Sequence, residues 1–208
     1  MERTPRARSS PAGAGLRKWC RTDLDGFRLI SLSPAISADR AWRPVDSVRV
    51  AEITIRAYER RDAVGVADVF YRSVREVALS DYTPEQVGAW VPGRWDAERE
   101  HRRSGDGRLV LVAADEPGRV VAFIDLEPDG HIDRLFCAPE AAGRGVASRL
   151  YDAIEAAARA QGIQRLFTEA SEPARRFFER KGLTVLERQD MILRGVPIHN
   201  YRMAKTLG

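Results

Sequence analysis

Apolar and polar residues alternate with two different periods along residues 48–208, and these periods predict a series of strands and helices. Apolar side chains alternate with charged ones at 48–58, which predicts a strand, and recur every three to four residues at 62–79, which predicts a helix. The elements predicted after these are short helices at 84–91 and 95–103, strands at 109–114, 120–126 and 130–137, a helix at 143–160, a strand at 165–168, a helix at 174–181, and closing strands at 183–193 and 198–203. This order predicts an α/β domain with a mixed sheet.

Cap and turn residues set several of these boundaries. Thr83 is suited to cap a helix, and Pro84 suits the first helical position, where no backbone N–H is needed. Acidic residues with proline and glycine at 115–118 and 128–130 predict turns between strands. Gly182 follows a predicted helix at the position just beyond its end, which favours glycine.

The predicted strand at 130–137 departs from strict alternation. Its apolar residues Ile132, Leu135 and Cys137 are spaced by three and then by two positions, which predicts a β-bulge near 133–134. Because Cys137 continues this apolar series, we interpret it as a small buried hydrophobic residue and not as a nucleophile.

A glycine-containing loop follows this strand. The apolar run ends at Pro139, Gly143 and Gly145 come next, and an alanine-rich helical pattern then runs to Gly162. Glycines let the backbone approach a ligand closely, and the first helical turn directs unpaired N–H groups and the positive end of the helix dipole toward it. The segment therefore predicts a site for phosphate or pyrophosphate, and hence a phosphorylated cofactor.

Two segments resemble signatures of the GNAT family of acetyl-CoA-dependent N-acetyltransferases, and the resemblance extends over residues 48–205. Segment 142–147 is similar to the family's central motif, a Gln or basic residue followed by x-x-Gly-x-Gly/Ala. Segment 171–183 is similar to Asn-x-x-Ala-x-x-x-Tyr-x-x-x-Gly-Phe, and segments 81–90 and 194–201 resemble a YafP-like bacterial subgroup. The resemblance implies the acyl-CoA N-acyltransferase fold, a central mixed sheet with a splayed pair of parallel strands and helices on both faces.

The resemblance also implies how acetyl-CoA, the acetyl donor, is held. The strands at 131–137 and 164–168 would separate, with the pantetheine arm between them as if it were an added strand and the pyrophosphate at the glycine loop. No metal is implied. The residues expected to bind the donor are Leu135, Phe136, Cys137, Gly143, Arg144, Gly145, Val146, Ala147, Ser148 and Ser171.

Three positions depart from the family pattern. Ala142 stands where Gln or Arg is usual, and Ser171 stands where Asn is common. Phe178 stands where a tyrosine often protonates the leaving thiolate, so the general acid must come from elsewhere. Tyr201 and Tyr82 are the candidates for that acid.

Asp133 is the first candidate for the general base. It precedes Phe136 by three residues and matches an acidic residue that is the base in the histone-acetylating branch of the family. The alternatives are that Asp133 binds the ammonium of the substrate or holds the predicted bulge. His131 and His199 have side chains that titrate near neutral pH, but both lie at predicted strand ends, where a surface or turn role is the simpler interpretation.

Charge separates an N-terminal segment from the rest of the chain. Residues 1–48 carry nine Lys or Arg and five Asp or Glu, whereas residues 49–208 carry 25 of each. We therefore predict a poorly ordered extension at 1–47 and an acetyltransferase domain at 48–208. Because residues 49–208 carry equal numbers of basic and acidic residues, this domain is not expected to bind nucleic acid. No run in the sequence approaches the roughly 18 apolar residues of a membrane span.

Cysteine use and the start of the chain indicate a cytoplasmic setting. Cys20 and Cys137 are far apart and show neither a disulfide framework nor the spacing of a zinc site. The Arg-rich start has no apolar h-region, so no secretory signal is expected.

Two other functions compete with acetyl transfer. The glycines at 143–148, with Glu169 further on, partly match a dinucleotide-binding oxidoreductase, but the third glycine is missing and too few strands follow. A domain that binds acyl-CoA without turnover is favoured by Ala142 and Phe178. The acceptor is expected to be a small-molecule or peptide amine of unidentified class, and a homodimer formed by the final strands is left open.

Overall fold

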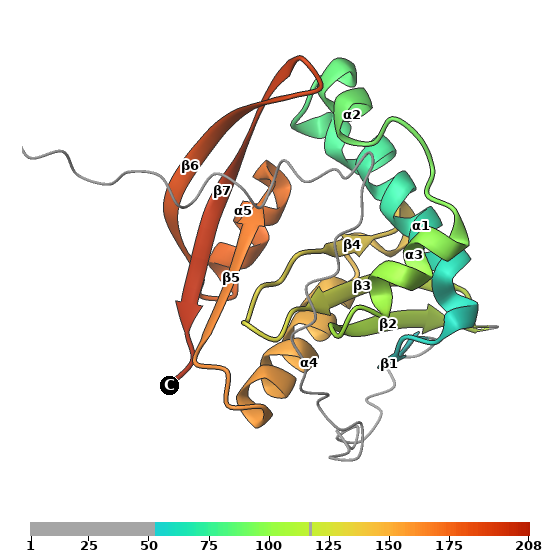
Figure 1. Cartoon of the computed structure of the whole chain (residues 1–208), viewed down its shortest axis with the longest axis vertical. Coiled ribbons are helices and arrows are strands. Elements are labelled where there is room, and N and C mark those ends of the chain that lie inside the picture. The colour runs from blue at the N-terminus through green and yellow to red at the C-terminus, as the bar shows by residue number, and fades with distance from the viewer. Residues whose placement is uncertain (1–52, 117) are drawn as a thin grey trace, which may run out of the picture. The chain divides into compact units, whose positions relative to one another are not determined.

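Two antiparallel sheets carry the fold of the described residues, 53–116 and 118–208 in this computed structural model (Figure 1). The first sheet has the order β1 (Ile53–Ala57), β2 (Leu109–Asp115), β3 (Val120–Leu126) and β4 (Leu135–Cys137). The second has the order β5 (Arg165–Ala170), β7 (Val196–Thr206) and β6 (Thr184–Leu193). The extension predicted at 1–47 and the domain start predicted at 48 lie outside the described residues.

The sheets meet at one parallel bridge between His131 and Phe167. The Ile132 N–H donates to Phe167 O (2.8 Å), and the Phe167 N–H donates to Gly130 O (3.1 Å). Beyond this bridge β4 and β5 diverge, as Figure 1 shows. The splayed parallel pair of the predicted fold is thus confirmed, and within residues 53–116 and 118–208 this is the one β-bridge that joins the two sheets.

The predicted strand at 130–137 is regular only at β4. The Asp125 N–H of β3 donates to Arg134 O (3.0 Å), and the N–H of Glu127, which follows β3, donates to His131 O (2.8 Å). Ile132 and Asp133 therefore stand together opposite a single β3 residue, which is the two-to-one pairing of a β-bulge. The predicted bulge is confirmed, and it explains why the strand is shorter than predicted.

Helical segments cover one face of the first sheet. The prediction of one helix over 62–79 was wrong, because this stretch is divided into four elements. They are the 3₁₀ turn η1 (Arg60–Asp62), α1 (Ala63–Arg72), the π-helical turn η2 (Ser73–Val77) and the 3₁₀ turn η3 (Ala78–Ser80). Then come α2 (Pro84–Trp90) and α3 (Ala97–Ser104). Residues of α1, η2, η3 and α2 pack with Phe123 and Phe136 in one apolar cluster.

The predicted start of α2 is confirmed. Thr83 Oγ1 accepts from the Gln86 N–H (3.2 Å), and Gln86 Oε1 accepts from the Thr83 N–H (3.0 Å). This reciprocal pair is a capping box, with Pro84 at the first helical position.

The opposite face of the first sheet is covered by α4 (Val146–Ala160), which follows the short turn η4 (Pro139–Ala141), whereas α5 (Glu172–Arg180) packs on the second sheet. Leu150 and Ile154 of α4 are fully buried against Leu111, Ile124 and Leu166 of the two sheets. One apolar core therefore extends across the junction between the sheets.

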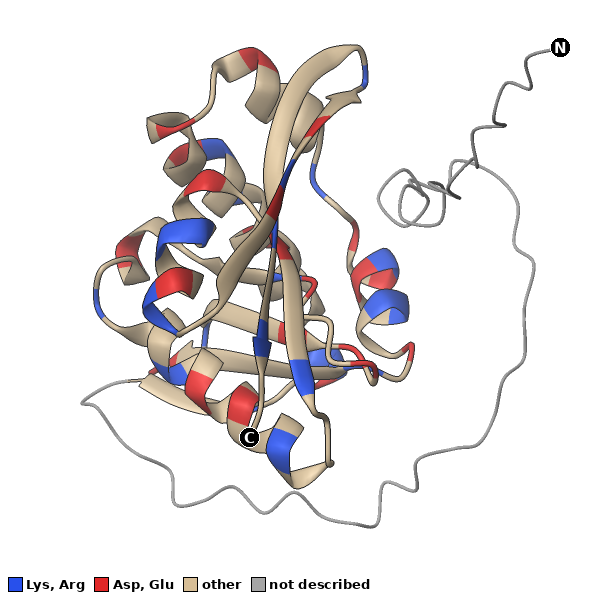
Figure 2. Cartoon of the chain, turned by 90° about the vertical axis from the view of Figure 1, so that its left-hand side faces the viewer, with Lys and Arg blue, Asp and Glu red and all other residues tan. Residues whose placement is uncertain are grey.

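The second sheet ends in a tight hairpin. Arg194 and Gly195 connect β6 to β7 with φ angles of 50° and 83°, and Leu193 pairs with Val196. Positive φ at both loop residues is the signature of a type I′ turn. Among the described helices, none is both long and apolar enough to cross a membrane. Basic and acidic residues are interspersed over the described helices and strands (Figure 2).

Candidate active site

A pocket of about 690 Å³ opens between β4, the start of α4 and α5. Nine of the ten residues predicted to bind the acetyl donor line it, and Arg144 lies exposed in the same loop. The nine are Leu135, Phe136, Cys137, Gly143, Gly145, Val146, Ala147, Ser148 and Ser171.

The glycine loop keeps the start of α4 open. Gly143 and Gly145 have φ angles of 74° and 77°, a left-handed conformation that costs other residues roughly 1–2 kcal/mol. A Cβ atom built on either glycine would have no neighbour within 4 Å. Gly145 is the N-cap of α4 and has no side chain to cap the first helical turn, and Val146, Ala147 and Ser148 of that turn line the pocket.

Cys137 is a half-buried wall residue of this pocket. Burial raises the pKa of its thiol to about 11, and a hydrogen bond from the Ala147 N–H offsets only part of that effect. The thiol is therefore neutral at neutral pH, which agrees with its interpretation as a small apolar residue.

Two cations of the pocket were not predicted. Arg180 and Lys181 line it at the end of α5, together with Ala174 and Phe177. Lys181 Nζ also pairs with Asp152 Oδ1 at 2.6 Å. Since positions three to four residues apart share a helix face, the spacing 174, 177, 181 was a usable signal in the sequence.

The far wall of the pocket comes from the irregular end of the first helix. Ser73, Val74 and Val77 of the π turn η2 line the pocket with Trp90 of α2. Single π turns inside helices often occur at functional sites. Neither the π turn nor this wall was predicted, because residues 62–79 have the pattern of a regular helix.

Asp133 lies outside the pocket lining. Its Oδ2 accepts hydrogen bonds from Arg103 Nη2 and from Arg108 Nη1, the latter at 2.8 Å. Protonation of this carboxylate would weaken both ion pairs. The contacts match the alternative in which Asp133 holds the bulge.

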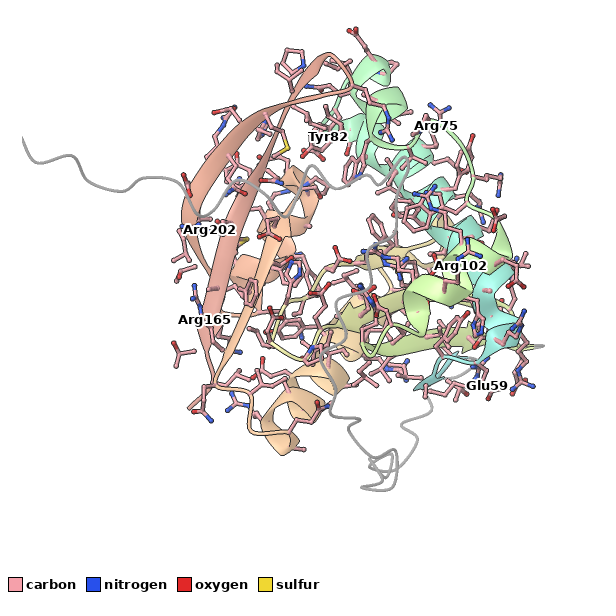
Figure 3. All side chains as sticks on the ribbon, viewed as in Figure 1. Glu59, Arg75, Tyr82, Arg102, Arg165 and Arg202 are labelled. Atoms are coloured by element: carbon pink, nitrogen blue, oxygen red, sulfur yellow. The ribbon has the colours of Figure 1, made fainter. Side chains whose placement is uncertain are left out.

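Tyr82 connects the α2 segment to the second sheet and α5 (Figure 3). Its hydroxyl accepts from the Glu172 N–H (2.9 Å) and donates to His199 O (3.3 Å). Its ring packs against Trp90 with a centroid distance of 5.7 Å. Burial raises the pKa of Tyr82, so the hydroxyl is protonated at neutral pH.

Tyr201, on β7, also contacts Glu172. Its hydroxyl bonds to the Glu172 carboxylate, which raises the pKa of Tyr201. His199 Nε2 lies 3.6 Å from Glu172 Oε2. The structure thus brings both predicted acids to the start of α5, whereas Phe178 is buried in the core with 2% of its surface exposed.

His131 lies between two carboxylates where the sheets meet. Its Nε2 is 2.7 Å from Glu169 Oε2 of β5, and its Nδ1 is 3.5 Å from Glu127 Oε2. Burial disfavours the charged ring, but the two carboxylates outweigh burial and raise the pKa of His131 to about 9. The charged imidazole ties the sheets together at neutral pH, so the surface or turn role expected for His131 was wrong.

Comparison with known proteins identifies the family. Residues 78–205 match the family described as "Acetyltransferase (GNAT) domain". The chain is 29% identical over 154 residues to the uncharacterized N-acetyltransferase YafP of Escherichia coli K12, which covers 73% of this chain and 94% of YafP.

Solved structures agree with this assignment. A GCN5-related N-acetyltransferase from Rhodopseudomonas palustris is 34% identical, with a TM-score of 0.68 over 76% of this chain and 97% of that one. PaiA N-acetyltransferase from Thermoplasma acidophilum, in complex with coenzyme A, shares the fold at 19% identity, with a TM-score of 0.59 over 76% of this chain and 100% of that one. This chain belongs to the GNAT acetyltransferase family.

Proposed function

We propose that this protein transfers an acetyl group from acetyl-CoA to a primary amine by direct transfer in a ternary complex. The observation that carries the proposal is the pocket, which extends from the start of α4 to Trp90 and Ser171. Tyr82 lies behind this wall, where it contacts Trp90 and the backbone of Glu172. Two distant relatives of the same fold were solved with coenzyme A or acetyl-CoA, PaiA and yncA from Salmonella typhimurium.

The residues present fit such a ligand. The glycine loop and the first turn of α4 offer backbone N–H groups to a pyrophosphate, and Arg180 and Lys181 add positive charge on the facing wall. β4 is the last strand of its sheet and pairs only with β3 there, so its other edge can bond to the amides of a pantetheine arm.

When bound, acetyl-CoA supplies a thioester carbonyl and a thiolate leaving group. Tyr82 holds a proton beside the pocket wall and is the better placed of the two candidate acids, because it contacts Trp90 and the residue after Ser171. Asp133 is paired with two arginines, so we assign it to holding the bulge and not to proton removal.

Ligand binding is tested by thermal unfolding with acetyl-CoA, CoA, NAD⁺ or ATP in excess. A ligand at about 100 times its Kd stabilises the fold by roughly 2.7 kcal/mol, which raises Tm by several degrees. We expect this shift with acetyl-CoA and CoA only. Gly143→Asp, which puts a carboxylate at the proposed phosphate site, should abolish the shift.

Gly107→Asp is the matched control. Gly107 also has a positive φ, 102°, and an added Cβ there would have no neighbour within 4 Å. This variant should keep the full shift. A shift with NAD⁺ alone, or an unchanged CoA shift in Gly143→Asp, would contradict the proposal.

The acid is tested by turnover of an amine panel. Tyr82→Phe should lower kcat by about 10²-fold or more, the usual contribution of a general acid, while its Tm shift with CoA is kept. Tyr201→Phe is the control and should retain most activity. If Tyr201→Phe is the inactive variant, the acid is Tyr201, and if wild type turns over no amine, the chain is an acyl-CoA-binding module.

A further inference from the structure

β6 forms the outer edge of the second sheet, in which the strand order is β5-β7-β6 (Figure 1). It is ten residues long and carries exposed apolar side chains, with Leu186 47% and Ile192 63% exposed. A long edge strand with exposed apolar residues is a template for pairing with another chain.

The hairpin determines which backbone groups of β6 point outward. In a two-residue I′ hairpin the closing pair, here Leu193 with Val196, is hydrogen-bonded across the strands. Along β6, residues whose backbone groups bond to β7 alternate with residues whose backbone groups point away from it. Counted from Leu193, the N–H and C=O groups of Arg188, Asp190 and Ile192 therefore point away from β7. These three residues are available to bond to a further strand.

We propose that this edge pairs with the same edge of a second copy, antiparallel and with the two-fold axis at Gln189. Arg188 of each copy then lies opposite Asp190 of the other, and the two sheets join into one of six strands. At the ends of the paired segment, Leu186 of one copy lies opposite Ile192 of the other. The exposed apolar residues therefore cover one another.

Charge selects this register. If the axis passed through Asp190, the Asp190 residues of the two copies would lie opposite each other, and if it passed through Arg188, the two arginines would. Like charges directly opposite each other destabilise a strand pair. With the axis at Gln189 both charged positions meet their opposites. Within one chain Arg188 and Asp190 already pair at 2.9 Å on an exposed face, with side chains 53% and 72% exposed, so both are free to exchange partners.

A bulge limits the regular pairing on one side. The β6–β7 register shifts between Val185 and Glu187, which leaves Leu186 as the extra residue. The regular contact between copies therefore spans residues 187–191 of each strand, with Leu186 and Ile192 flanking it.

Sedimentation and light scattering of the full chain test the interface. Wild type should be dimeric at about 100 μM, a concentration at which a Kd in the micromolar range populates the dimer. Arg188→Asp and Asp190→Arg should each give monomers. The double exchange Arg188→Asp with Asp190→Arg should restore the dimer, because it restores both cross-strand pairs.

A cross-link tests the register. Residues directly opposite at a non-hydrogen-bonded position have Cα atoms about 4.5 Å apart, within the range that a disulfide spans. Gln189→Cys should therefore form a reducible dimer under mild oxidation. Glu187→Cys, whose two copies are offset by four residues or about 13 Å along the strand, should not.

Three results would overturn the proposal: a monomeric wild type, single charge variants that remain dimeric, or equal cross-linking of Gln189→Cys and Glu187→Cys. Wild type under the same oxidation controls for links through Cys20 and Cys137. None of these readouts uses ligand binding or turnover, so their outcome is independent of the proposed function.

Discussion

Arg134→Met is expected to lower the free energy of unfolding by about 3–5 kcal/mol, because it leaves buried Glu100 without its ion-pair partner and leaves buried Asp125 with only the more distant Arg108 Nη1, 3.4 Å away. Arg134 Nε donates to Asp125 Oδ2 at 2.6 Å, and its Nη1 donates to Glu100 Oε2 at 2.9 Å. The guanidinium side chain is 4% exposed, and both carboxylate side chains are fully buried. Methionine keeps an apolar chain against Phe123, over whose ring the guanidinium lies at 4.8 Å, so the substitution mainly removes the charge.

Urea unfolding measures this loss, with Arg119→Met as the control. Arg119 pairs with Asp115 at 2.9 Å, but its side chain is 64% exposed, and such surface pairs contribute about 0–1 kcal/mol. A triple variant with Arg134→Met, Asp125→Asn and Glu100→Gln should recover part of the loss, because it removes the unpaired charges. Equal losses in Arg134→Met and Arg119→Met would show that the buried ion pairs do not stabilise the fold.

Gly130→Ala is expected to cost roughly 2–5 kcal/mol, the sum of left-handed backbone strain and overpacking. Gly130 has a φ of 94°, and a Cβ built on it would lie 2.0 Å from Arg165 O, a backbone atom that cannot rotate away. Gly130 O also accepts from the Phe167 N–H at the bridge between the sheets. The methyl group would therefore push the two sheets apart where they are joined.

Gly107→Ala separates the two contributions. It shares the positive φ, 102°, but its Cβ would meet no atom within 4 Å, so we expect only the backbone cost of about 1–2 kcal/mol. Both variants are measured by urea unfolding, and only Gly130→Ala should also reduce the thermal shift with CoA, because the pocket opens where the sheets diverge. Equal destabilisation by the two variants would mean that the added methyl group at Gly130 does not disturb the bridge between the sheets.

Local patterns in the sequence were sufficient for most elements and for the cofactor loop. The continuous apolar runs of β2 and β3, the cap at Thr83 and the helical stripe of α4 are each specified within a few residues, and the structure has them near their predicted places. The wall formed by Gly143 to Ser148 could also be predicted, because a strand, a glycine loop and a helix start are consecutive in the chain. The spacing around Ile132 was likewise enough to predict the bulge.

Contacts between distant segments were decided only by the tertiary structure. The sequence by itself determined which residues form strands and helices, which loop can hold an anion, and which side chains carry titratable groups, because these depend on neighbours in the chain. It did not determine that Asp133 meets Arg103 and Arg108, that Tyr82 meets Glu172, or that the strands divide into two sheets at His131. Those outcomes depend on which faces pack together across the chain, and a residue's chemistry changes with the charges and burial that packing brings to it.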